Sequence, residues 1–123
     1  MSCPTSTFEP KFPIEASPSL GCTARRQAED MSIRGFFSHR NPDGDGPLER
    51  AGQAGFRGIV GENLAWGQAT VADVISAWLA SPEHCEAMAS DRYRLGGAGR
   101  AVSARGRNYW TLMLGAEGQA SGP

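Results

Sequence analysis

The sequence lacks the features that mark several large classes of protein. Its 123 residues carry a formal net charge of −1, so there is no basic excess to favour nucleic acid or an anionic membrane. No apolar run is long enough to span a bilayer. The first residues, Met1-Ser2-Cys3-Pro4, have neither the basic nor the apolar region of a signal peptide. We therefore expect either a cytosolic chain or a mature or truncated form of a longer one.

Familiar catalytic motifs are missing too. There is no G-x-S-x-G elbow of serine hydrolases, no P-loop, no H-E-x-x-H zinc motif and no dinucleotide fingerprint. Three cysteines allow at most one internal disulfide and leave one thiol over. His84 and Cys85 are adjacent, and neighbours on a helix do not face each other, which disfavours a thiol–imidazole pair. The composition, 40% hydrophobic and 20% charged, fits one ordinary globular domain.

Only two histidines are present, and both lie in short contexts that suggest a site. His39 ends the run G-F-F-S-H, and His84 follows S-P-E. Between them lies Glu62, flanked by a glycine and an asparagine. Two imidazoles and a carboxylate are the ingredients of a divalent-metal site or an acid/base site. Each residue alone is more often a cap or a surface group, so the interpretation depends on whether the three meet in the fold.

Local patterns predict helices first and strands late. Ser17-Pro18 is a typical helix start, and Gly35 is a typical end. Further helices are predicted over 47–54, from Thr70 onward and over 82–89. The stretch 56–67 is predicted to be irregular or strand-like, and strands are predicted over 95–102 and 108–115. This order predicts an α+β fold with helices packed on a small, mostly antiparallel sheet. We expect residues 1–16 to be an extended arm, 17–116 the domain and 117–123 a disordered tail.

Apolar side chains at helical spacing identify the expected core. One stripe on the long helix consists of Leu20, Ala24, Ala28 and Met31, and the helix from Thr70 has an apolar face of Val71, Val74, Ile75, Trp78 and Leu79. The aromatic residues are expected in the core rather than on a ligand platform; they are Phe36, Phe37, Trp66, Trp78 and Trp110. The 41–46 loop, N-P-D-G-D-G, has the composition of half a calcium loop but lacks its spacing and terminal glutamate.

Five short motifs, in order and at fixed spacing, resemble the CAP superfamily of cysteine-rich secretory, antigen 5 and pathogenesis-related 1 proteins. They are F-F-S-H, N-P-D-G, G-E-N-L-A, A-W-L-x-S-P-x-H and Y-W-T, and the resemblance runs from about Pro13 to Gly115. The match is to the short bacterial, SCP-like branch. It implies a three-layer α-β-α sandwich with a central cleft, in which the family's first helix is missing before Cys3. It also implies a secreted or periplasmic protein, expected to be a monomer.

The resemblance also implies a set of cleft residues. His39, Glu62 and His84 match the family's first histidine, its glutamate and its second histidine, which in some members hold zinc or another divalent cation. Ser81 stands where eukaryotic members have a second glutamate, so that set is incomplete. Asn63 and Tyr109 are expected to line the cleft with Ser81. Further departures remove polar partners around it: Glu83 replaces a glycine, Ala87 an asparagine and Leu112 a glutamine.

The same resemblance implies how the cysteines pair. Cys3 and Cys85 match positions at which bacterial relatives often carry cysteine, which implies a Cys3–Cys85 disulfide. Cys22 is the competing partner of Cys3.

Three functional hypotheses follow. The favoured one is a secreted binding or structural module whose cleft holds a metal, a small ligand, a lipid or a peptide without reaction. The second is a metal-dependent, peptidase-like hydrolase with a His39–His84–Glu62 site and Glu62 as the candidate catalytic residue. The third is a histidine–glutamate network that only fixes the fold. The sequence gives no case for a nucleic-acid partner or a membrane span.

Overall fold

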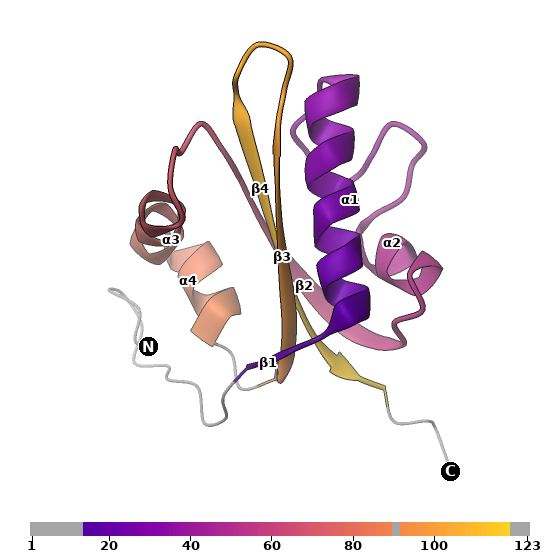
Figure 1. Cartoon of the computed structure of the whole chain (residues 1–123). Coiled ribbons are helices and arrows are strands. Elements are labelled where there is room, and N and C mark those ends of the chain that lie inside the picture. Colours follow the sequence, from indigo (N-terminus) through magenta and orange to yellow (C-terminus); the bar gives the residue numbers. More distant parts are fainter. Residues whose placement is uncertain (1–13, 90–91, 119–123) are drawn as a thin grey trace.

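A four-stranded sheet lies between two layers of helices (Figure 1). The computed structural model describes residues 14–89 and 92–118. The elements in chain order are β1 (Glu15–Ala16), α1 (Pro18–Arg34), α2 (Pro47–Gln53), β2 (Gly58–Trp66), α3 (Val71–Ala80), α4 (Pro82–Ala89), β3 (Leu95–Val102) and β4 (Asn108–Glu117). Helices α1 and α2 lie on one side of the sheet and α3 and α4 on the other (Figure 1). The predicted α+β sandwich is therefore confirmed.

The strand order in the described part of the chain is β1-β3-β4-β2, and among these strands the short β1–β3 pairing alone is parallel. β2 is thus an edge strand, paired with β4 from Gly58 opposite Glu117 to Trp66 opposite Tyr109.

Of the predicted arm, residues 1–13 lie outside the described part of the chain; Glu15–Ala16 form β1. Of the predicted tail, Glu117 belongs to β4, and 119–123 lie outside the described part. None of the described helices is long and apolar enough to cross a membrane.

Helix α1 packs directly on the sheet. Ser17 Oγ accepts a hydrogen bond from the Leu20 amide at its start, and Gly35 ends it with φ of 72°, in the left-handed region that favours glycine. The predicted apolar stripe is confirmed, since its four members are fully buried: Leu20, Ala24, Ala28 and Met31. The helix comes so close to β3 that a Cβ on Gly99 would lie 2.5 Å from Arg25 Cα. Two glycines of β3, Gly97 and Gly99, therefore allow this contact.

The two faces of the sheet bury two sets of side chains. On the α3 side they are Ala65, Val74, Trp78, Tyr93, Trp110 and Leu114, and on the α1 side Leu20, Ala24, Met31, Ala51, Phe56, Leu64, Tyr109 and Met113. The alternation predicted along β4 is thus confirmed, with both of its faces covered. Val71, predicted on the apolar face of α3, is instead 63% exposed, because it stands in the first turn, before the buried contacts begin at Val74.

Two of the five aromatic residues expected in the core are at the surface. Phe37 is 47% exposed and Trp66 is 46% exposed, whereas Trp78 and Trp110 are buried. Trp66 is the last residue of β2, beyond the area that the helices cover. Its ring is contacted edge-on by Phe37, with centroids 6.4 Å apart, and the Arg107 guanidinium lies 4.1 Å from its centroid. At this end of the sheet the Trp66 ring is therefore held by Phe37 and Arg107 and not by residues of the core.

Candidate functional site

Glu62 is a buried carboxylate whose oxygens are bound by Arg50 and His39. Its side chain is 1% exposed, although β2 is an edge strand. Arg50 Nη1 donates to Oε2 at 2.8 Å, and Arg50 Nη2 donates to Oε1 at 3.1 Å. Arg50 is itself 8% exposed. Such a two-point ion pair satisfies both oxygens of the carboxylate and the charge of the guanidinium.

Helix α2 presents Arg50 to the sheet. Its start is fixed by Pro47 and by Glu49, whose carboxylate accepts a hydrogen bond from the Gly46 amide at 2.7 Å. Arg50 also donates from Nη2 to the backbone carbonyl of His39 at 2.5 Å. One guanidinium therefore joins α2, β2 and the segment that carries the first histidine.

His39 lies at the surface end of this network. Its Nδ1 is 2.8 Å from Glu62 Oε1, and because an ionised carboxylate only accepts, Nδ1 is the donor. The imidazole is 55% exposed. The hydrogen bond to Glu62 raises the pKa of His39 above its ordinary value of 6.5, against smaller opposing effects of burial and of the nearby Arg50 charge. Protonated His39 is thus favoured beside Glu62.

His84 belongs to α4, in the opposite helical layer. Its Nδ1 is hydrogen-bonded to Ser81 Oγ at 3.0 Å. Asn63, 1% exposed, donates from Nδ2 to the His84 backbone carbonyl at 3.2 Å. Because successive side chains of a strand point to opposite faces, Glu62 reaches the layer of α1 and α2, whereas Asn63 reaches that of α3 and α4.

The structure therefore brings together only part of the expected site. His39 meets Glu62, while His84 meets Ser81 and Asn63. Within residues 14–89 and 92–118, no three His, Cys, Asp or Glu side chains are arranged to hold a metal ion. Tyr109 is buried against Met31 and Leu64, and its place in the cleft lining stays a prediction. The bound metal stays a prediction.

Sequence reasoning missed two polar residues that organise this region. They are Arg50, described above, and Gln27. The Gln27 side chain is 1% exposed and donates from Nε2 to the Ser38 carbonyl at 2.9 Å. Gln27 lies on the buried stripe of α1, three residues after Ala24, so a polar residue on an apolar face was the available signal. For Arg50 the signal was weaker, since nothing in its local pattern distinguishes a buried arginine from an exposed one.

The structure describes two of the three cysteines, Cys22 and Cys85. Cys22 is a free cysteine on α1, which removes it as the expected competitor for a disulfide. Cys85 is fully buried on α4. Cys3 lies outside the described residues, so the Cys3–Cys85 pairing stays a prediction.

Comparison with known proteins gives relatives of similar fold. The chain is 28% identical over 103 residues to the uncharacterized protein YkwD of Bacillus subtilis, covering 83% of this chain and 39% of that protein. An outer surface protein of Borrelia burgdorferi superposes with a TM-score of 0.77 at 23% identity, covering 86% of this chain and 79% of that one. An extracellular protein of Bacillus anthracis that contains an SCP domain superposes with a TM-score of 0.73 at 21% identity, over 86% and 35%.

The chain spans well under half the length of YkwD and of the Bacillus anthracis protein, so these likenesses concern one domain. The two solved structures, at less than 25% identity, show the fold alone. The family model for cysteine-rich secretory proteins matches residues 11–114, which is most of the sequence. The expected resemblance is thereby confirmed, and the chain belongs to the CAP family of cysteine-rich secretory proteins.

Proposed function

We propose that this CAP domain is an extracellular binding module that catalyses no reaction. In this proposal the Arg50–Glu62–His39 network is an internal brace that fixes the segment from Ser38 to Gly46 as a recognition surface. The observation that carries it is the state of Glu62: the carboxylate is 1% exposed and both of its oxygens are engaged. A general base or metal ligand needs an oxygen that faces the substrate or the ion.

The braced segment is held at several points. Gln27 and Arg50 bind the adjacent carbonyls of Ser38 and His39. Asn41 Oδ1 accepts hydrogen bonds from the backbone amides of Asp43, at 3.0 Å, and Asp45, at 2.9 Å. A surface ordered in this way before binding loses less conformational entropy when a ligand docks, which favours recognition.

The residues fit a three-ligand metal centre poorly. The Arg50 guanidinium binds both oxygens of Glu62 and neutralises the charge of that carboxylate. His84 is held in the other layer. The hydrolase alternative therefore receives little support from the arrangement of these side chains.

The extracellular setting rests on the CAP family and on the extracellular protein of Bacillus anthracis with an SCP domain. The proposed Cys3–Cys85 disulfide is consistent with that setting, because disulfides persist in oxidising compartments. With Cys22 free, these two cysteines are the remaining pair.

The deciding experiment compares wild type with Glu62→Gln and with Glu83→Gln, an exposed control with the same change of charge. Each is incubated with peptide, ester and peptidoglycan substrates, with and without added zinc. We expect no turnover, and faster hydrogen exchange over residues 38–46 in Glu62→Gln alone. Turnover in wild type that is lost in Glu62→Gln would refute the proposal. Unchanged exchange in Glu62→Gln would refute the bracing role.

A further inference from the structure

A hollow of about 500 Å³, the hairpin hollow, lies at the end of the sheet where β3 turns into β4. Its walls include Ser32 and Gly35 at the end of α1, Gly67 after β2, and the turn from Ser103 to Arg107. The β3–β4 hairpin and this end of α1 lie side by side at the top of Figure 1. Three segments that are distant in the sequence therefore meet at one surface.

Large apolar side chains are exposed around the hairpin hollow. Trp66 and Phe37 are each nearly half exposed, and Ile33 and Val102 are exposed further. Trp66, Ile33 and Val102 are each the chain neighbour of a residue that lines the hollow, and Phe37 contacts the Trp66 ring. Soluble proteins rarely leave several large apolar side chains exposed in one place, and such patches mark interaction sites.

Two arginines of the hairpin turn line the same hollow without an acidic partner. Neither the Arg105 nor the Arg107 side chain forms an ion pair or a hydrogen bond with another residue that the structure describes. The Arg107 guanidinium lies 4.1 Å from the centroid of the Trp66 ring. Stacking on a ring holds a guanidinium in place and leaves the N–H donors at its edge free, so that it can bind a carboxylate at two points.

The turn that presents these arginines is ordered by its own hydrogen bonds. The Ser103 amide donates to the Arg107 carbonyl, and the Gly106 amide donates to the Ser103 carbonyl, each at 2.8 Å. The Arg107 amide donates to Ser103 Oγ at 3.1 Å. Gly106 has φ of 85°, which favours glycine. This backbone is formed before any partner arrives, so little conformational entropy is lost on binding.

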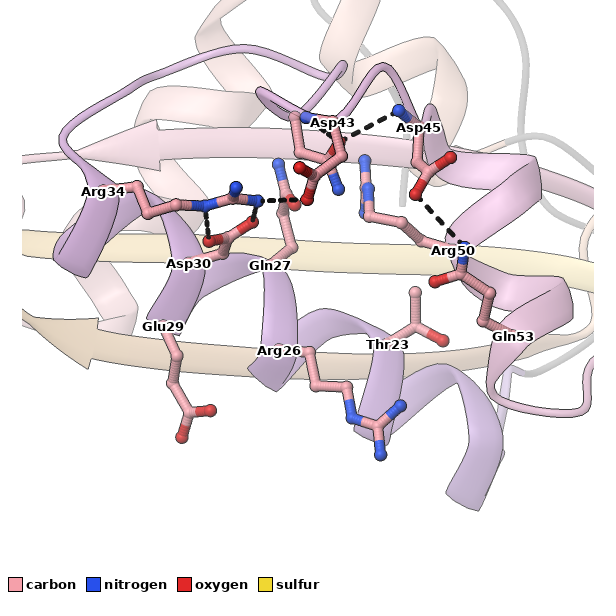
Figure 2. Close-up of a pocket in the computed structure, with 11 residues that line it drawn as sticks. Thr23, Arg26, Gln27, Glu29, Asp30, Arg34, Asp43, Asp45, Arg50 and Gln53 are labelled. Carbon is pink, nitrogen blue, oxygen red and sulfur yellow. Dashed lines mark hydrogen bonds and ion pairs between the residues drawn. The ribbon is translucent and has the colours of Figure 1, made fainter.

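A hollow between α1, the 41–46 loop and α2 shows the opposite arrangement of charge (Figure 2). There the Arg34 guanidinium is paired with the carboxylates of both Asp30 and Asp43. The chain itself thus supplies the acidic partners of that arginine. At the hairpin hollow the described residues supply none, so we expect the carboxylate to come from a partner molecule.

Other anionic partners fit the hairpin hollow less well. Anionic membranes are recognised by clusters of about four to eight basic residues, and nucleic acids also require many phosphate contacts. The lining of this hollow contains two arginines. A small inorganic anion would leave the exposed apolar side chains uncovered. Trp, Tyr and Arg are, by contrast, the residues that contribute most to binding between proteins.

From these contacts we infer that the hairpin hollow binds a peptide segment of a partner protein in which an acidic residue lies next to a large apolar one. The carboxylate pairs with Arg105 and Arg107, and the apolar side chain packs beside Trp66. This surface shares no residue with the Ser38–Gly46 recognition surface proposed above. Either surface can therefore be refuted while the other stands.

The test selects peptides from a random library displayed on phage, with the wild-type protein as bait. An enriched peptide is synthesised together with a neutral copy, in which Asn and Gln replace its Asp and Glu. We expect enriched peptides to combine an acidic with a large apolar residue. In titration calorimetry the neutral copy should bind about tenfold more weakly, because charge-assisted hydrogen bonds are lost. Vesicles of phosphatidylglycerol and inorganic phosphate serve as comparison probes. The absence of any enriched peptide, equal binding of the neutral copy, or binding of either comparison probe in place of peptide would overturn the inference.

Matched variants assign the peptide to this surface. Arg107→Gln and Trp66→Ser should each weaken binding by about tenfold. Arg26→Gln, which removes the same charge from the exposed side of α1, should leave it unchanged. Arg105→Gln, at an exposed position of the turn, adds a variant with little risk to folding, and melting curves identify any variant that fails to fold. Amide chemical shifts should move over residues 32–37 and 102–109. Unchanged peptide affinity in both folded arginine variants would place the peptide elsewhere and refute the assignment.

Discussion

Arg50 and Glu62 form a two-point ion pair between α2 and β2, with Nη1–Oε2 and Nη2–Oε1 distances of 2.8 and 3.1 Å. Both side chains are almost completely buried, at 8% and 1% exposure. A buried pair of this kind is costly to break from one side, because the remaining charge then lacks both water and a partner. The pair should therefore dominate the electrostatic contribution to the stability of this domain.

Removal of one partner tests this directly. Arg50→Met should lower the free energy of unfolding by about 3 kcal/mol, since Glu62 is left buried with His39 as its remaining partner and Oε2 loses its bond. The double variant Arg50→Met/Glu62→Leu should recover much of that loss, because neither charge remains. Urea denaturation of the two single variants and the double variant gives the coupling energy.

Arg34→Met is the matched control, since the Arg34–Asp30 pair is partly exposed and its loss should cost much less than the loss of Arg50. If Arg50→Met costs no more than Arg34→Met, the Arg50–Glu62 pair is not the brace described above.

His39 should make stability depend on pH. Its pKa in the folded state is raised above 6.5 by the hydrogen bond to Glu62. Its stabilising effect should thus be fully present below the unfolded-state pKa and disappear as pH rises through the folded-state pKa. The free energy of unfolding of wild type relative to His39→Gln, which stays neutral, should be greatest in acid and shrink above neutrality.

An NMR titration of the His39 imidazole provides the independent measurement. A midpoint at or below the ordinary histidine value would contradict the contact with Glu62. The same titration in Glu62→Gln should move the midpoint down, because the carboxylate that favours the imidazolium is gone.

Much of the fold was predictable from local patterns. The start of α1 at Ser17-Pro18, its end at Gly35 and its stripe of buried apolar residues each follow from rules that act within a few positions. The exposure of Phe37 and Trp66 was not predictable in this way. It depends on where the helical layers stop covering the sheet, which is a property of the assembled fold.

The site was predictable only in part for a similar reason. The motif around Glu62 indicated a residue of importance, but its principal partner, Arg50, comes from a different helix with no local signal of burial. The separation of His84 from Glu62 follows from strand alternation at Glu62 and Asn63, combined with the placement of α4 on the Asn63 side. Motif order alone contains no information on which layer a helix joins.

The contact of α1 with β3 predicts a strong effect from a very small substitution. In Gly99→Ala the added methyl group would lie 2.5 Å from Arg25 Cα, so the helix must move away from the sheet. We expect a loss of about 3 kcal/mol, at the upper end for overpacked cores. Gly52→Ala, in α2, meets nothing within 4 Å and should instead stabilise by about 0.5 kcal/mol or more through helix propensity. Equal effects of the two variants on thermal unfolding would show that α1 does not rest on Gly99.

The state of the cysteines provides the last prediction. With Cys22 free, alkylation of the folded, unreduced protein should add one label, at Cys22, and reduction under denaturing conditions should expose two more thiols. Reduction should also destabilise the protein by about 4 kcal/mol, since the proposed Cys3–Cys85 bond closes a long loop of the unfolded chain. Cys22→Ala should leave this reductant effect intact, whereas Cys85→Ala should remove it. Labelling of all three cysteines before reduction would refute the pairing, and labelling at Cys3 or Cys85 in place of Cys22 would show that another pair forms.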